Sequence, residues 1–243
     1  MSKKLKIIIK NFQGIGYSES LRLQQIKHQA VLNGDDPGYL LFIEHRDQVI
    51  TLGKNANENH LVAKKEELAY EDISLVQIDR GGQMTAHMPG QLVIYPIIKL
   101  SEFNLTVRNF IHLLEQCVIN VLSRYGINAG RRRKYPGVWV EDGKICAIGI
   151  RIKQRISMHG LALNFNGNLK IFSHFVPCGI KSAKVVNFID CSSKPASIKG
   201  LAESFARELF LLLGLDTGDV ASQTGHWDKF VDDVPWQEKS NGT

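Results

Sequence analysis

Cysteine is the side chain best suited to nucleophilic chemistry, and one of the four in this sequence has a context that favours it. Cys178 lies between Pro177 and Gly179, in a run typical of a stiff, exposed loop. Cys117 lies on the apolar side of a periodic helical segment, which indicates a structural role. A thiol is nucleophilic as its thiolate, a form that a nearby cation stabilises. The loop context ranks Cys178 first without establishing that it is reactive.

The spacing of the cysteines bears on metal binding and disulfides. They stand at positions 117, 146, 178 and 191, and no two of them form a CxxC pair. This spacing argues against a zinc ribbon or a thioredoxin-type site. The N-terminal apolar run is also too short for a signal peptide. We therefore expect free thiols, no bound metal and a cytoplasmic location.

A lysine and a glycine-rich run are the other candidates for chemistry. Lys144 follows Asp142-Gly143, a dipeptide typical of hairpin turns, and this pattern alone indicates an ordinary surface charge. The run 79–91 carries Gly81-Gly82 after a predicted strand. Paired glycines let a backbone approach a ligand closely, although a plain loop explains them equally well. No Gly-Lys-Ser/Thr ending follows, so the run is not a phosphate-binding P-loop.

Several periodic segments must position these residues. Helices are predicted over 18–32, 106–125 and 198–213, the first capped by Ser18 and closed by Asn33-Gly34, the second capped by Thr106. Strands are predicted over 39–43, 48–52, 75–78, 92–98, 138–140, 145–152 and 161–165. The mixture predicts a single α+β domain over 1–216, with mixed or antiparallel sheets flanked by helices. The polar residues 217–243 are predicted to form a frayed tail.

Side-chain alternation along the predicted hairpin strand divides its residues between two faces. One face would carry Ile145, Ala147, Gly149 and Arg151. The other would carry Lys144, Cys146, Ile148 and Ile150.

Composition narrows the class of protein. The 243 residues are 44% hydrophobic and 22% charged, which is ordinary for a globular domain. No apolar run is long enough to span a bilayer, so we expect no membrane insertion. The net charge of +6 could favour nucleic acid, a membrane surface or an acidic protein. No nucleic-acid motif accompanies it, which argues against a basic binding module. The densest basic run is Arg131-Arg132-Arg133-Lys134, typical of a solvated loop.

Six blocks in a fixed order give the sequence a family resemblance over about residues 40–180. They are Arg80-Gly81-Gly82-Gln83-Met84-Thr85 with His87 and Pro89-Gly90-Gln91; Arg132-Arg133; Pro136-Gly137-Val138-Trp139; Gly143-Lys144-Ile145 with Ala147-Ile148-Gly149; His159-Gly160-Leu161-Ala162; and Pro177-Cys178-Gly179. In this order and spacing the blocks resemble the lipoyl(octanoyl) transferase family.

The resemblance implies a cysteine/lysine acyltransferase on the fold shared by biotin and lipoate protein ligases. Such enzymes move an octanoyl group from acyl carrier protein to a lysine of a lipoyl domain, the first step of endogenous protein lipoylation. The acceptors would be lipoyl domains of 2-oxoacid dehydrogenases and the glycine cleavage H protein. By similarity, Cys178 is the thioester nucleophile and Lys144 favours its thiolate. The acyl pocket would be lined by Arg80, Gly81, Gly82, Gln83, Met84, Thr85, Ala86, His87, Ala147, Ile148, Gly149, Gly160, Leu161 and Ala162.

The chemistry suits these residue types. A thioester donor needs a soft nucleophile, and cysteine provides it. The thioester is already activated, so we expect no cofactor and no metal. We also expect the enzyme to be a monomer. An ATP-dependent lipoate protein ligase and a lipoyl-domain amidotransferase are the nearest alternatives on the same fold. In the acyltransferase interpretation, the basic run 131–134 is a candidate docking site for an acidic carrier protein.

Three residues depart from the pattern of the family. Ala86 stands where a large polar or aromatic residue is usual, Met88 where glycine is usual, and Val176 where asparagine is common. A methionine brings a flexible apolar side chain to a site. We therefore predict that Ala86 and Met88 reshape the acyl pocket, and that Met88→Gly changes the preferred chain length.

Overall fold

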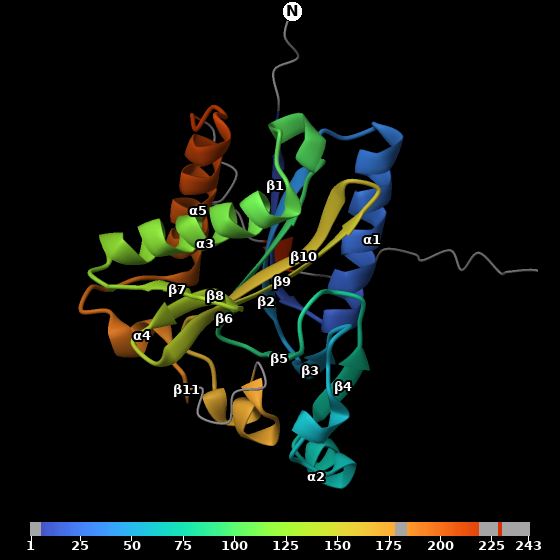
Figure 1. The fold of residues 1–243 in the computed structure, drawn as a ribbon, viewed down its shortest axis with the longest axis vertical. Helices are drawn as coiled ribbons and strands as arrows, with labels where there is room; N and C mark the ends of the chain where they lie inside the picture. Colours follow the sequence, from blue (N-terminus) through green and yellow to red (C-terminus); the bar gives the residue numbers. More distant parts are fainter. Residues whose placement is uncertain (1–5, 178–183, 219–227, 230–243) are drawn as a thin grey trace, which may run out of the picture.

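A computed structural model describes residues 6–177, 184–218 and 228–229 of this chain. Helices flank two sheets (Figure 1). The α-helices are α1 (Tyr17–Asn33), α2 (Lys65–Tyr70), α3 (Val107–Arg124), α4 (Phe188–Cys191) and α5 (Ile198–Leu213). Short 3-10 helices lie at Glu58–His60, Leu100–Phe103 and Leu169–His174. Among the described residues, no helix combines the length and apolar character needed to cross a bilayer.

A nine-stranded mixed sheet forms the centre of the fold. Its order is β12-β1-β2-β6-β10-β9-β8-β7, and β11 adds in parallel beside β9. Its members are β1 (Ile8–Ile15), β2 (Tyr39–His45), β6 (Gln91–Ile97), β7 (Gly130–Arg132), β8 (Tyr135–Val140), β9 (Gly143–Lys153), β10 (Ile156–Asn164), β11 (Lys184–Val185) and β12 (Asp228–Lys229). A second sheet, of order β4-β3-β5, contains β3 (Gln48–Leu52), β4 (Ile73–Gln77) and β5 (Met84–His87). The α+β class with mixed sheets is confirmed.

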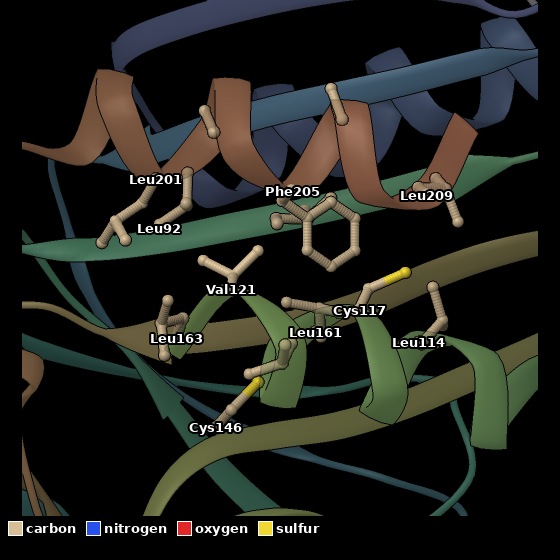
Figure 2. Packing of buried hydrophobic residues seen from close by; sticks show 14 of the residues in the cluster. Leu92, Leu114, Cys117, Val121, Cys146, Leu161, Leu163, Leu201, Phe205 and Leu209 are labelled. Carbon is tan, nitrogen blue, oxygen red and sulfur yellow. The ribbon is translucent and has the colours of Figure 1, made fainter. Parts of the chain in front are cut away.

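Helices cover both faces of the large sheet. On one face, α3 and α5 bury their apolar sides against β6, β9 and β10, and Figure 2 shows Phe205, Val121 and Leu161 meeting there. On the other face, α1 packs against β10, β6 and β2. Cys117 and Cys146 are fully buried in the first of these cores, where burial raises the pKa of both thiols. The structural role predicted for Cys117 is confirmed.

Helix caps follow the sequence signals in two of three places. Thr106 Oγ accepts a hydrogen bond from Asn109 N at 3.1 Å, as its position before α3 predicts. Gly34 ends α1 in the left-handed region, also as predicted. Ser18 is not a cap, because α1 begins one residue earlier, at Tyr17. The Asp47 carboxylate instead accepts from Tyr17 N at 3.1 Å, so a distant residue satisfies the first turn.

Two segments differ from what local sequence predicted. The glycine-rich run contains strand β5, because Met84–His87 pairs antiparallel with β3. In the C-terminal tail, Asp228–Lys229 forms β12 and pairs in parallel with β1. The rest of the tail beyond residue 218 lies outside the described residues.

Candidate active site

A cavity of about 540 Å³ lies beside the strands that carry most of the predicted site residues. Its volume is within the range of sites that hold small ligands. Glycines and apolar side chains form most of the wall, with a few polar groups between them. The lining draws on β5, β9, β10, the start of α3, and Lys134 with the first two residues of β8. These elements are distant in sequence, so the sheet topology builds the cavity.

Most residues named from sequence line this cavity. They are Lys144, Arg80, Gly81, Gly82, Gln83, Met84, Thr85, His87, Ala147, Ile148, Gly149, Gly160, Leu161 and Ala162. Ala86 is not in the lining: it is fully buried in a separate apolar cluster with Ile50 and Met84. Cys178 lies outside the described residues, whereas Pro177, directly before it, lines the cavity.

Lys144 is buried, which corrects the surface position that its hairpin turn suggested. Its side chain is 7% exposed and lines the cavity. The cause is a β-bulge where β8 meets β9: Val138 pairs with Cys146, but Trp139 already pairs with Lys144. Ile145 and Cys146 are therefore both buried in the core, although they are neighbours in the strand, and Lys144 points to the cavity instead. Bulges re-aim side chains in this way.

The bulge thus overturns the strict alternation predicted for β9. Lys144 shares the cavity with Ala147 and Gly149 instead of lying with Cys146 on the core face. Its Nζ donates to the carbonyl of Pro136 at 2.9 Å and lies 4.9 Å from the centre of the Trp139 ring. A buried ammonium held by a carbonyl and an aromatic face is stabilised in a fixed position.

Arg80 is a second buried cation of the cavity, at 6% exposure. Its guanidinium donates to the carbonyl and hydroxyl oxygens of Thr51, each at 2.9 Å, and to the carbonyl of Gly81 at 3.0 Å. A side chain at Gly149 would bring its Cβ within 3.0 Å of Arg80 Cδ, so glycine lets Arg80 lie directly on β9. Arg80 is a rigid part of the wall.

Histidines and tyrosines form an uncharged section of the site. Burial is the main cause that lowers the pKa of His159 to about 4, helped by Arg80, and it holds the pKa of His87 well below its usual range. Burial also raises the pKa of Tyr17 to about 12. His87 and Tyr17 stack with ring centres 5.5 Å apart. These groups are therefore neutral at pH 7.

His159 is held in an unusual backbone conformation within this section. Its φ is +57°, in the left-handed region, and its N–H donates to Gln24 Oε1 at 2.9 Å. Its Nε2 lies 2.9 Å from Asp79 Oδ1. A carboxylate can only accept, so neutral His159 carries its proton on Nε2. Asp79 also pairs with Arg151, and the three side chains brace one another beside the cavity.

Several lining residues were not predicted from the sequence to belong to the site. Tyr17, Val107, Ile111 and Phe172 come from elements outside the glycine and cysteine runs. No local signal marks them, because each is an apolar or aromatic residue of a kind found in any core. Lys134 also lines the cavity, and the basic run that contains it was the available signal.

Met88 does not line this cavity. It is 1% exposed, packs with Ile171 and Phe175, and borders a separate, polar depression with Glu44 and Gly90. The predicted reshaping of the acyl pocket by Ala86 and Met88 therefore finds no support in this geometry. Both side chains belong to the core beneath the smaller sheet.

Comparisons with known proteins agree with the fold and the site. Residues 16–210 match the family described as the lipoyl protein ligase A/B catalytic domain. An octanoyltransferase of Bacteroides fragilis is 38% identical over 219 residues, covering 86% of this chain and 99% of the relative. One from Dictyoglomus thermophilum is 44% identical over 185 residues, covering 76% and 78%.

A solved structure shows the same fold at low sequence identity. The putative lipoate protein ligase from Thermoplasma acidophilum with bound lipoic acid superposes with a TM-score of 0.69 at 15% identity, covering 93% of this chain and 90% of that one. The resemblance inferred from the ordered blocks is therefore confirmed. The chain belongs to the octanoyltransferase family, acyltransferases that transfer an octanoyl group to lipoyl domains.

Proposed function

We propose that this octanoyltransferase works through an acyl-cysteine intermediate, with Cys178 as the nucleophile and Lys144 as its proton-handling partner. The observation that carries the proposal is the buried position of Lys144 on the cavity that Pro177 also lines. Cys178 directly follows Pro177 in the sequence. Placing a cation near the thiol favours the thiolate that attacks a thioester.

The transfer occurs in two balanced steps. The Cys178 thiolate attacks the carbonyl carbon of the octanoyl thioester, a new C–S bond forms, and the carrier's C–S bond breaks. The carrier leaves as a thiol after taking a proton from the Lys144 ammonium. The acceptor lysine amine then attacks the acyl-cysteine, an amide C–N bond forms, and the C–S bond to Cys178 breaks, releasing the thiolate. Neutral Lys144 takes the amine proton, which restores the thiolate and ammonium pair.

Acyl carrier protein as the donor belongs to the same proposal, and the basic run provides a docking surface for it. Two of its residues have internal partners: Arg131 pairs with Glu115, and Arg132 pairs with Asp142. Arg133 and Lys134 are exposed, and Lys134 also borders the cavity. An acidic carrier could therefore meet these two cations beside the entrance for its acyl group.

Replacing one rim lysine tests the docking surface. Lys134→Ala should raise KM for octanoyl carrier protein up to about fivefold, because one exposed charge pair contributes at most about 1 kcal/mol. KM for octanoyl-pantetheine, which has no carrier protein, should not change. Lys199→Ala is the matched control, because Lys199 is exposed on α5 and does not line the cavity. Equal effects on both donors would contradict docking at Lys134.

Intact-mass spectrometry tests the covalent step directly. After incubation with octanoyl carrier protein, the enzyme should gain one octanoyl group that hydroxylamine removes. Cys178→Ala should gain none. A full adduct on Cys178→Ala, or wild-type turnover in that variant, would overturn the acyl-cysteine mechanism.

The alternative of an ATP-dependent lipoate protein ligase is kept because solved ligases share this fold. Such an enzyme would need ATP and would not need Cys178. Octanoyl transfer from a thioester without added nucleotide separates the two activities. Three further expectations, one catalytic domain over 1–216, a monomer and a cytoplasmic location, complete the proposal. Limited proteolysis, size-exclusion chromatography and cell fractionation test them in turn.

A further inference from the structure

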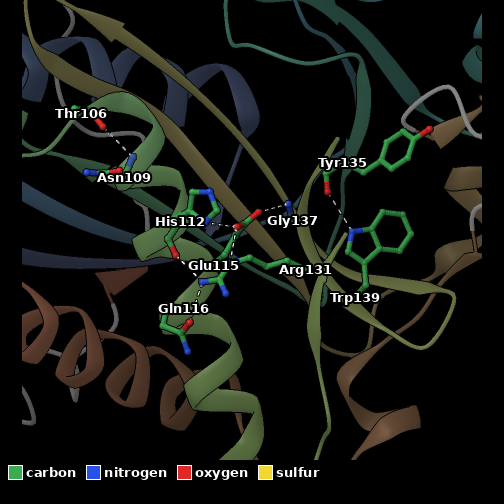
Figure 3. A network of polar contacts seen from close by, with 9 residues as sticks. All are labelled: Thr106, Asn109, His112, Glu115, Gln116, Arg131, Tyr135, Gly137 and Trp139. Carbon is green, nitrogen blue, oxygen red and sulfur yellow. Dashed lines mark hydrogen bonds and ion pairs between the residues drawn. The ribbon is translucent and has the colours of Figure 1, made fainter. Parts of the chain in front are cut away.

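Glu115 is a buried carboxylate of α3 that lies behind the wall of the cavity. Its side chain is 6% exposed, although it is a carboxyl group on a helix whose other buried residues are apolar. Figure 3 shows its two oxygens directed at different partners. Oε1 accepts from the backbone N–H of Gly137 at 3.0 Å, and Oε2 accepts from Arg131 Nε at 2.8 Å. Burying a carboxylate is costly, so these partners keep it in place.

The Gly137 contact connects Glu115 to Lys144 through a single peptide unit. The N–H of Gly137 and the carbonyl of Pro136 belong to the same peptide group, which is planar and stiff. That carbonyl accepts from Lys144 Nζ at 2.9 Å. The order of contacts is therefore carboxylate, peptide N–H, peptide C=O and ammonium. Each hydrogen bond in such a series polarises the next one.

The peptide lies against the lysine with no spare space. Gly137 has a φ of +126°, a conformation that side-chain-bearing residues rarely adopt. A Cβ at this position would lie 2.4 Å from the carbonyl oxygen of Cys146 and 3.1 Å from Lys144 Cε. Any side chain at this position would therefore displace Lys144, and glycine lets the peptide lie directly against it.

Arg131 completes the arrangement by fixing the carboxylate. Besides Glu115, its guanidinium donates to the carbonyl of His112 and to Gln116 Oε1, each at 2.9 Å. These anchors lie on α3 itself, so the arginine ties β7 to the helix that carries Glu115. The Arg131–Glu115 pair keeps the carboxylate in place, and the arginine cation compensates its buried negative charge.

We propose that Glu115 is a positioning residue for Lys144, acting through the Pro136–Gly137 peptide. It is not among the residues that line the cavity in the described part of the chain, so it would not touch the acyl group. The proposal rests on the catalytic role assigned to Lys144 above. Glu115 fixes the direction of the Pro136 carbonyl, and the carbonyl fixes where the ammonium meets the reacting sulfur atoms. Without Glu115 the Gly137 N–H loses its side-chain acceptor, so the peptide is held less firmly and Lys144 loses part of its fixed donor geometry.

Two variants of Glu115 and one control separate positioning from simple stability. Glu115→Ala removes the acceptor for the Gly137 N–H, whereas Glu115→Gln keeps an oxygen at that place. Glu208→Ala is the matched control: Glu208 is also a buried helical glutamate, paired with Arg124 and Asn120, and it does not line the cavity. Folded enzyme is quantified for each variant before its rate is measured.

The first readout is the rate of single-turnover acylation by octanoyl-pantetheine. Glu115→Ala should lower the acylation rate constant by about tenfold to a hundredfold, the size expected when a catalytic group is misplaced by about 1 Å. KM should stay unchanged, because the cavity wall is intact. Glu115→Gln should recover most of the lost rate, and Glu208→Ala should react like the wild type.

The second readout does not depend on activity. Reductive methylation followed by peptide mass spectrometry reports how readily the Lys144 amine reacts. We expect faster labelling of Lys144 in Glu115→Ala than in the wild type, and no change in Glu208→Ala. Unchanged labelling and an unchanged acylation rate in Glu115→Ala would overturn the positioning role. An equal loss of rate in Glu208→Ala would also overturn it, because the effect would then be general.

A Lys144→Met variant separates the proposed catalytic role of Lys144 from the proposed positioning role of Glu115. If Lys144→Met keeps full acylation activity, the proposed catalytic role of Lys144 fails, and the labelling result alone then decides whether Glu115 positions this lysine. If Lys144→Met is inactive while both readouts for Glu115→Ala match the wild type, the catalytic role stands and the positioning role fails.

Discussion

Replacing the methionine that begins β5 and the one that directly follows it tests where chain-length preference is set. Met84 and Met88 are both buried in the same apolar cluster, at 4% and 1% exposure. Only Met84 lines the 540 Å³ cavity. Met88 instead lies against Gly167, where an added Cβ would be 3.0 Å from Met88 Cε. The two side chains are thus matched in type and burial but differ in contact with the cavity.

Truncating either methionine should destabilise the fold to a similar extent. A buried Met→Ala change costs about 2–5 kcal/mol, since it removes packing and leaves a void. A loss of about 3 kcal/mol would lower Tm by about 6–12 °C in a domain of this size. Total stabilities of about 5–15 kcal/mol leave most of either variant folded at 25 °C.

The two variants should differ in substrate preference. Met84→Ala enlarges the cavity, so the ratio of kcat/KM for ten-carbon over eight-carbon thioesters should rise by about tenfold, the effect of roughly one methylene group. Met88→Ala should leave that ratio unchanged. Six-, eight- and ten-carbon thioesters compared in both variants give the measurement. A shift in Met88→Ala as large as that in Met84→Ala would refute the placement of Met88 outside the acyl pocket.

Two further predictions concern the cavity wall and acid stability. Gly149→Ala would place a Cβ 3.0 Å from Arg80 Cδ and 3.1 Å from the Gly81 carbonyl, so Arg80 must shift and acylation should slow by about tenfold while circular dichroism stays native. Burial lowers the pKa of both His45 and His159 from 6.5 to about 4. Between these two pH values the unfolded state binds more protons than the folded state. The free energy of unfolding therefore falls as the pH falls, by up to about 1.4 kcal/mol per pH unit for each histidine. Urea unfolding from pH 7.5 to 5 measures this slope; it should flatten in His45→Gln, and an equal slope in that variant would contradict it.

Local chemistry made parts of the fold predictable from sequence. The cap at Thr106, the left-handed Gly34 and the buried stripe containing Cys117 each depend on a few neighbouring residues. The six ordered sequence blocks predicted most of the lining residues of the cavity, because a family's sequence pattern can be recognised without knowing how the chain folds. These features need no knowledge of distant contacts.

The position of Lys144 could not be predicted in this way. A bulge depends on how two strands pair, and the β9 sequence read alone gives only strict alternation. The place of Met88 outside the cavity lining could not be predicted either. The departure from the family pattern was visible, but the face on which Met88 packs is decided by β5 pairing with β3. Glu115 carried no signal either, because its partner is a backbone N–H from another element.

The charged side chains among the described lining residues of the cavity are all positive. Among the described lining residues, Arg80, Lys134 and Lys144 are cationic, and none is a carboxylate. Asp79 and Glu115 are not among these lining residues, and they hold His159 and the Gly137 peptide. In the proposed mechanism, acyl transfer passes through two anions, a thiolate and a tetrahedral oxyanion. The buried cations Arg80 and Lys144 would favour both species before the substrate arrives, which is the electrostatic preorganisation that lowers reaction barriers.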